Sequence, residues 1–244
     1  MLYHRYTYIL INHIATYQEY FPFDCLVHGV FRFANYYEDH MVLQRAPQKS
    51  IVWGYTDTTD FPITLAMNNK VYQATFSKSN KANDLTIWAV QLDAQPEEGP
   101  FQVKVSRKLQ NGTVETIFLD DVLFGDVWVC SGQSNMEFAV NRMFNGTVEI
   151  ENAYKYPKIR LFTAALRQAY TPEEELLAVG LHWSVASNVS VGSNYASAVC
   201  WLYGRMVQAA LGGRPMGLVH SSWGGTGIEF WSPPEALKAC GIEQ

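Results

Sequence analysis

The sequence of 244 residues lacks any uninterrupted apolar run of about 18 residues, so no membrane-spanning helix is expected. It also lacks an excess of basic residues, because 18 Lys and Arg stand against 23 Asp and Glu. The resulting formal net charge of -5 offers nucleic acid no basic surface. No Cys-x-x-Cys pair and no Gly-Lys-Ser/Thr sequence occurs, which argues against a structural zinc site and a P-loop.

The N-terminus lacks the features of a convincing signal peptide. Asn12 and His13 interrupt its apolar centre, and no small-residue cleavage site follows. Residues 1–30 show no clear hydrophobic period and are predicted to be an appendage. Three Asn-x-Ser/Thr tripeptides are candidate glycosylation sites if the chain enters a secretory compartment: Asn111, Asn145 and Asn188. The four cysteines can be buried thiols or form one or two disulfides, and their spacing does not decide between these alternatives: Cys25, Cys130, Cys200 and Cys240.

Residues 31–119 consist of short, often alternating apolar segments. Pro, Gly, Asn and Asp turns separate them, and strand starts recur about every 8–12 residues. This pattern predicts an antiparallel β-sandwich of jelly-roll-like form.

Residues 120–244 change to a strand–turn–helix pattern. The segments 125–130, 158–164 and 216–222 are predicted to be buried strands. A helix is predicted over 137–144, ended by Asn145-Gly146, and a second over 193–211, ended by Gly212-Gly213. Strands that alternate with helices predict a parallel sheet with both faces covered. Only about three strands are visible before residue 244, so this α/β module is expected to be a truncated core.

The sharpest motif, Ser131-Gly-Gln-Ser134-Asn-Met, follows the first of these strands. Reactive crevices in open α/β sheets lie at the carboxyl ends of strands, where the Ser134 hydroxyl would point into the crevice. Backbone N–H groups of the following helix can stabilise an oxyanion there. Ser134 to Glu137 equally fits a helix capping box, and the spacing alone leaves both interpretations open.

A second motif, Ser221 to Trp231, follows the strand 216–222. Its three glycines, Gly224, Gly225 and Gly227, allow backbone amides to face a ligand, as in an oxyanion hole. A flexible loop without a binding role is the alternative.

Taken together, FRFANYYEDHMVLQRAP, IVWGY, DVLFGDVWVCSGQSNMEF, SAVCWLYGR and HSSWGGTGIEFW resemble the animal sialate O-acetylesterases of the SGNH-type hydrolase superfamily. The resemblance runs from about Phe31 to Cys240. It implies a β-domain on an α/β/α hydrolase core, a lysosomal or secreted location, no metal or organic cofactor, and hydrolysis of acetyl esters on sialic acids. Ser134 would be the nucleophile, and the oxyanion and substrate would be bound by Gly132, Gln133, Asn135, Gly224, Gly225 and Thr226.

The family's Asp/His pair, which activates the serine, has no counterpart here, so the chain alone is expected to be nearly inactive. His220 is a weak candidate for the base, His182 resembles an ordinary strand residue, and Asp126 is interpreted as a structural partner. Two alternatives stay open: an inactive carbohydrate-binding fragment, and an acetylesterase for another acetylated glycan such as xylan. Oligomeric state is not indicated.

Overall fold

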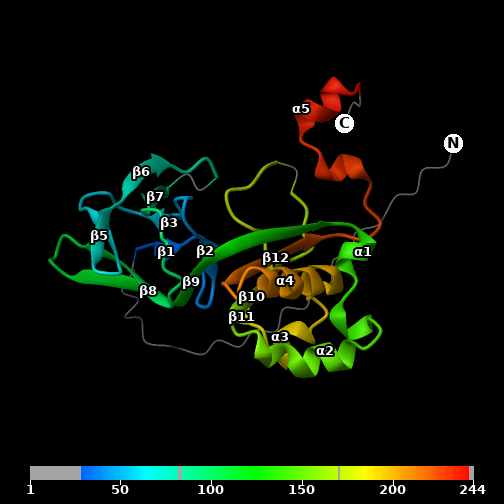
Figure 1. The fold of residues 1–244 in the computed structure, drawn as a ribbon. Helices are drawn as coiled ribbons and strands as arrows, with labels where there is room; N and C mark the ends of the chain where they lie inside the picture. The colour runs from blue at the N-terminus through cyan, green and yellow to red at the C-terminus, as the bar shows by residue number, and fades with distance from the viewer. Residues whose placement is uncertain (1–28, 82–83, 170, 242–244) are drawn as a thin grey trace, which may run out of the picture.

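The computed structural model describes residues 29–81, 84–169 and 171–241. The chain is mixed α/β, as predicted, with a β-sandwich followed by a mostly parallel sheet and helices (Figure 1). One face of the sandwich is a four-stranded antiparallel sheet in the order β1-β3-β7-β6, formed by β1 (Phe31–Phe33), β3 (Ile51–Thr56), β7 (Thr86–Gln91) and β6 (Thr75–Lys78). The N-terminal appendage lies outside the described residues except for Gly29 and Val30.

The second sheet is built around one long strand, β9 (Val114–Gly132). The first part of β9 continues the sandwich antiparallel to β8 (Phe101–Lys108), followed by β4 (Ile63–Met67) and β5 (Lys70–Gln73). Its last part runs parallel to β12 (Met216–Ser222), and residues 123–125 pair with β2 (Val42–Gln44). Beyond β12 lie β10 (Ile159–Ala164), which is parallel, and β11 (Val179–Val185), which is antiparallel. A single strand therefore connects the sandwich to the edge where Ser134 lies.

Alternation of buried and exposed side chains produces the sandwich core. In β8, Val103 and Val105 are fully buried while Lys104 between them faces outward, as the period of two requires. Trp88 of β7 lies between the two sheets, and its indole N–H donates to the carbonyl of Tyr55 at 3.2 Å. Burial of each such apolar side chain contributes about 1.5–3 kcal/mol, which makes this core a rigid base for β9.

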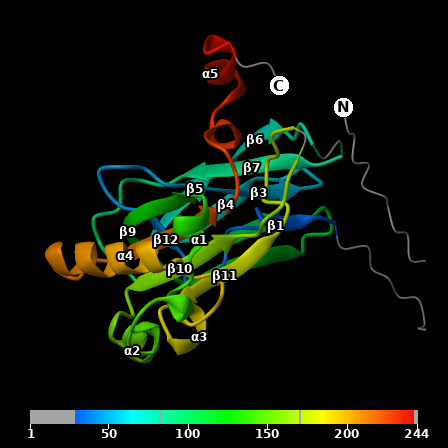
Figure 2. The same ribbon diagram turned by 90° about the vertical axis from the view of Figure 1, so that its right-hand side faces the viewer.

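Helices cover one face of the parallel sheet (Figures 1 and 2). They are α2 (Gly146–Asn152), α3 (Asn188–Val191) and α4 (Ala198–Ala210), with the short 3₁₀ turn η2 (Ala153–Lys155). Leu161 and Leu218 of the sheet pack against Trp201 of α4 in one buried cluster. None of the described helices combines the length and apolarity needed to cross a bilayer.

The predicted helix 193–211 ends as expected but begins later. α4 starts at Ala198, because the Ser197 hydroxyl, rather than Ser193, caps it by accepting the N–H of Cys200 at 3.2 Å. Gly212 and Gly213, with φ of 74° and 78°, end it.

The predicted helix 137–144 is wrong. The chain instead forms α1 (Ser134–Glu137), the 3₁₀ turn η1 (Val140–Arg142) and then α2. The helix breaks because the Phe138 carbonyl accepts the N–H of Ala198 at 2.8 Å and the Val140 N–H donates to Ala196 at 2.9 Å. These bonds to a distant segment replace those that a continuing helix would make. Asn145, with φ of 59°, begins α2 and does not end a helix.

The other face of the parallel sheet carries no described helix. Phe162 and Trp183 join the sandwich core there, and the loop 165–178 adds Leu176. Beyond Gly125, the outer edge of β9 pairs with no strand among the described residues, and Val129 is 68% exposed. After β12 come the 3₁₀ turn η3 (Ile228–Trp231) and α5 (Pro234–Ala239), which projects away from the body in both views (Figures 1 and 2).

Candidate active site

Ser134 lies where β9 ends and α1 begins, at the carboxyl end of the parallel strands. β12 runs beside β9 in register, with Ser222 opposite Gly132, and the Trp223 N–H donates to the Gly132 carbonyl at 2.8 Å. Gly132 has a φ of 141°, a conformation that residues with side chains rarely adopt. The bend made at Gly132 leaves the Ser134 side chain exposed at the strand end.

The alternative in which Ser134 caps the helix is wrong. The N-cap is Gln133, which makes no side-chain capping bond, and Ser134 is the first helical residue. The Glu137 carboxylate turns away from the cap and accepts the backbone N–H of Gly224. The hydroxyl of Ser134 therefore has no capping role that would compete with chemistry.

Unpaired backbone N–H groups occur in both segments that meet at Ser134, namely the start of α1 and the glycine loop. Among the described residues, the N–H groups of Ser134, Asn135 and Gly225 donate to no protein acceptor. The side chains of Gln133 and Asn135 are exposed and equally unbonded within the same part of the chain. Preorganised N–H donors of this kind stabilise the negative charge of a tetrahedral oxyanion.

The glycine loop after β12 packs directly against the serine. A Cβ built on Gly224 would lie 3.6 Å from both Cα and Cβ of Ser134 and 2.6 Å from Oε2 of Glu137. Because the Gly224 N–H already bonds to Glu137, it is not a free oxyanion donor, whereas the Gly225 N–H is free within the described chain. Sequence analysis missed the anchoring role of Glu137, since only the fold brings Glu137 to Gly224.

A hollow of about 480 Å³ adjoins the turn before Ser134. Thr226 stiffens its far wall, because its hydroxyl donates to the Trp223 carbonyl at 2.7 Å and accepts the indole N–H of Trp231 at 2.8 Å. The hollow is lined on one side by the strand end and on the other by the loop: Ser131, Gly132, Gln133, Thr226, Gly227, Ile228 and Trp231.

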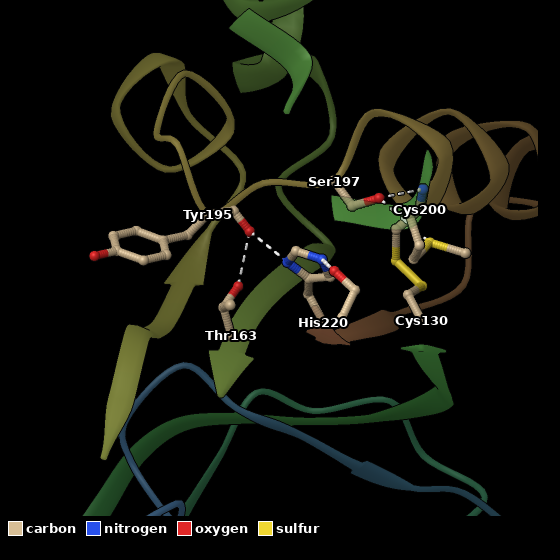
Figure 3. The surroundings of a disulfide bond; sticks show 8 residues. Cys130, Thr163, Tyr195, Ser197, Cys200 and His220 are labelled. Carbon is tan, nitrogen blue, oxygen red and sulfur yellow. Dashed lines mark hydrogen bonds between the residues drawn. A yellow bond between two sulfur atoms is a disulfide. The ribbon is translucent and has the colours of Figure 1, made fainter. Parts of the chain in front are cut away.

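His220, the candidate base, is buried, and Figure 3 shows it between Tyr195 and the disulfide. Its Nδ1 donates to the carbonyl of Tyr195 at 2.8 Å, and its Nε2 therefore accepts the hydroxyl of Ser222. Thr163 donates to the same carbonyl at 2.9 Å. Burial lowers the pKa of His220, and hydrogen bonds to the backbone of Tyr195 and Met136 and the charge of Glu137 oppose this only in part. His220 thus ties the neighbouring segments together as a neutral imidazole.

A disulfide between Cys130 and Cys200 joins the end of β9 to α4 beside His220 (Figure 3). It resolves the alternatives that the sequence left open for these two cysteines. Cys240 is an exposed free thiol, and Cys25 lies outside the described residues. The bridge closes a sequence separation of 70 residues and fixes the strand end four residues before Ser134.

The other described histidines contact carboxylates and not Ser134. His40 contacts Asp121 at 2.7 Å, and His182 of the edge strand β11 pairs with Glu38. Asp126 pairs with Arg214 at 3.4 Å, a structural contact of the kind expected for it. Within the described ranges, no group of three or more His, Cys, Asp or Glu could hold a metal ion. The three sequon asparagines are all exposed: Asn111, Asn145 and Asn188.

Comparison with known proteins agrees with this arrangement. Residues 124–240, which include Ser134 and the glycine loop, match the family described as carbohydrate esterase, sialic acid-specific acetylesterase. Mouse sialate O-acetylesterase is 41% identical to the chain over 217 residues, or 87% of this chain. Over these residues the chain is similar to the sialic acid-specific acetylesterases. The human sialate O-acetylesterase is 42% identical over 216 residues, again 87% of this chain.

The chain spans 39% of the length of the mouse protein and 40% of the human one. Among solved structures, a novel carbohydrate acetylesterase from Xanthomonas citri superposes with a TM-score of 0.71 at 28% identity. That match covers 84% of this chain and 43% of the bacterial one. The fold of this chain is therefore shared with a bacterial carbohydrate acetylesterase as well.

Proposed function

We propose that the chain supplies the nucleophile and the oxyanion-binding groups of an esterase that removes O-acetyl groups from sialic acids. The observation that carries the proposal is the position of the exposed Ser134 against the glycine loop, where the N–H groups of Ser134 and Gly225 have no protein acceptor within the described chain. The match to the sialic acid-specific acetylesterase family and the names of the mouse and human relatives support the substrate class.

In the proposed reaction, the Ser134 oxygen attacks the acetyl carbonyl and gives up its proton to a general base. The N–H groups of Ser134 and Gly225 stabilise the tetrahedral oxyanion. Its collapse expels the sugar hydroxyl, which takes a proton from the protonated base, and leaves an acetyl-serine. Water then attacks that ester, its proton passing to the base, and acetate leaves as Ser134 regains its hydrogen.

The base lies outside the described residues under this proposal. Each histidine within the described part of the chain, His40, His182 and His220, is engaged with other groups. The same observation favours a second candidate function, an inactive carbohydrate-binding fragment that uses the hollow beside Ser131. Loss of the base and its orienting carboxylate lowers the turnover of serine hydrolases by about 10⁴–10⁶-fold. The rate of ester hydrolysis therefore distinguishes the esterase from the inactive binding fragment.

An oxidising compartment, lysosomal or extracellular, fits the proposal. The disulfide between Cys130 and Cys200 is a bond that persists in secreted and endomembrane proteins and is rare in the cytosol. The exposed asparagines of the three sequons are accessible for glycan attachment in the same compartment.

A chimera tests the proposal. Residues 31–240 of this chain replace the matching segment of mouse sialate O-acetylesterase, and hydrolysis of 9-O-acetyl-N-acetylneuraminic acid and of an aryl acetate is followed. The chimera is expected to hydrolyse both, and Ser134→Ala is expected to lose at least about 10³-fold in kcat. The chain alone is expected to be slower by about 10⁴-fold or more.

The control is Ser77→Ala, which removes an exposed hydroxyl of β6 in the sandwich and should leave kcat within a few fold. An active chimera that tolerates Ser134→Ala would refute the assignment of the nucleophile. Full activity of the unextended chain would refute the external base. A chimera that cleaves acetylated xylan and leaves the sialic acid ester intact would shift the substrate to a neutral glycan.

A further inference from the structure

The loop between β10 and β11, described at residues 165–169 and 171–178, extends from the active-site end of the sheet to the sandwich (Figure 1). Three consecutive glutamates attach it there. Glu175 accepts a bidentate pair of bonds from Arg32 at 2.7 and 2.8 Å, Glu174 accepts the Ser79 hydroxyl at 2.7 Å, and Glu173 pairs with Lys81 at 3.1 Å. The loop is therefore held at a fixed place by the rigid sandwich.

The loop encloses a second hollow of about 350 Å³, separate from the one described above. Its charged lining residues are Arg167, Glu173 and Glu175. Both glutamates are already paired with cations, Lys81 and Arg32. Arg167 is exposed and has no hydrogen bond or ion pair with any described residue, so its positive charge is the uncompensated one.

This hollow adjoins the active site. Ser221 lines it, and Ser131 lines the hollow beside Ser134. Ser221 and Ser131 are paired in register on the parallel strands β12 and β9. Paired residues on neighbouring strands point to the same face and lie about 4.8 Å apart, so the two hollows are side by side on one face of the sheet.

We propose that Arg167 binds the carboxylate of the substrate and so selects acidic sugars over neutral ones. The proposal rests on the proposed acetylesterase function and adds a specificity residue to it. A sialic acid has its carboxylate at one end and its glycerol-like side chain, which carries acetyl esters, at the other. A guanidinium in the neighbouring hollow would hold the first end while the ester approaches Ser134, and Arg offers the planar, bidentate geometry that a carboxylate accepts.

Ligand binding tests this without catalysis. Ligand-observed NMR titrations of the chain compare N-acetylneuraminic acid with its methyl ester, which keeps the sugar and removes the charge. The wild-type chain is expected to prefer the free acid by about five- to tenfold, the range for a partly exposed charged hydrogen bond. Arg167→Gln is expected to abolish the preference. Arg142→Gln, at another exposed arginine without a partner in the described chain, should keep it.

Equal affinity of the wild-type chain for the acid and the ester would overturn the proposal, as would a preference that survives Arg167→Gln. Absence of binding for both ligands at millimolar concentration would also overturn it. These outcomes are independent of the Ser134 experiment. An active chimera with unselective binding refutes only the Arg167 subsite, and selective binding with an inactive chimera refutes only the esterase.

Discussion

The bond between Glu137 and Gly224 is expected to hold the glycine loop against Ser134, and Glu137→Gln tests this. A buried hydrogen bond to a charged acceptor stabilises a protein by about 1.5–3 kcal/mol. Glu137 is only half-buried, so its bond to Gly224 is expected to stabilise the closed loop by about 1 kcal/mol. The amide of Gln keeps the size of the Glu side chain and one acceptor oxygen. Any loss of loop stability in Glu137→Gln therefore comes from removal of the charge. A loss of about 1 kcal/mol makes the equilibrium constant for opening of the glycine loop about fivefold larger.

Hydrogen exchange with mass spectrometry measures this opening directly. Peptides that contain residues 223–227 should exchange about fivefold faster in Glu137→Gln, while peptides from β8 in the sandwich should be unchanged. Glu151→Gln, at an exposed glutamate of α2 without a partner among the described residues, is the matched control. Unchanged exchange over 223–227 in the Glu137 variant would refute the anchoring role.

Three further outcomes are expected. Gly224→Ala places a Cβ 2.6 Å from the Glu137 carboxylate and should reproduce the faster loop exchange, whereas a normal exchange rate would mean that the loop shifts at no cost. Urea titrations should show that stability falls below pH 6.5, since the unfolded chain then binds a proton that buried His220, with its lowered pKa, does not. His220→Gln should remove up to about 1 kcal/mol of this loss between pH 6.5 and 5.5, and an unchanged pH profile would contradict the cause. The double variant Cys130→Ala/Cys200→Ala should lose about 4 kcal/mol in the same titrations, because the bridge closes a sequence separation of 70 residues, and a loss below 1 kcal/mol would contradict the estimate.

Local patterns predicted the strands well. Segment 216–222 coincides with β12 and segment 158–164 with β10, because continuous apolar runs between turns leave few other conformations. The helix break at Phe138 was not predictable, since its cause is backbone pairing with residues 196–198, almost sixty positions away along the chain. Hydrophobic periodicity reports on one segment at a time. The break at Phe138 depends on the pairing of two distant segments, so periodicity cannot predict it.

The candidate site divides in the same way. The resemblance implied that Ser134 and the glycine loop belong to one site, and Gly224 does pack against Ser134. The contact of Glu137 with Gly224 and the pairing of Cys130 with Cys200 were not expected, because neither has a spacing signature. Both depend on how β9, α1 and α4 pack.

The two flanks of Ser134 differ, and this difference restricts where a base can approach. On the β12 side, Gly224 lies against the serine and its N–H is bonded to Glu137. Below the strand, Cys130 and His220 are buried against α4. The opposite edge of β9, over residues 126–132, pairs with no described strand, and Val129 is largely exposed there. An imidazole that takes the proton of Ser134 has its open approach along this unpaired edge of β9, because the glycine loop and the buried cluster against α4 occupy the other two flanks.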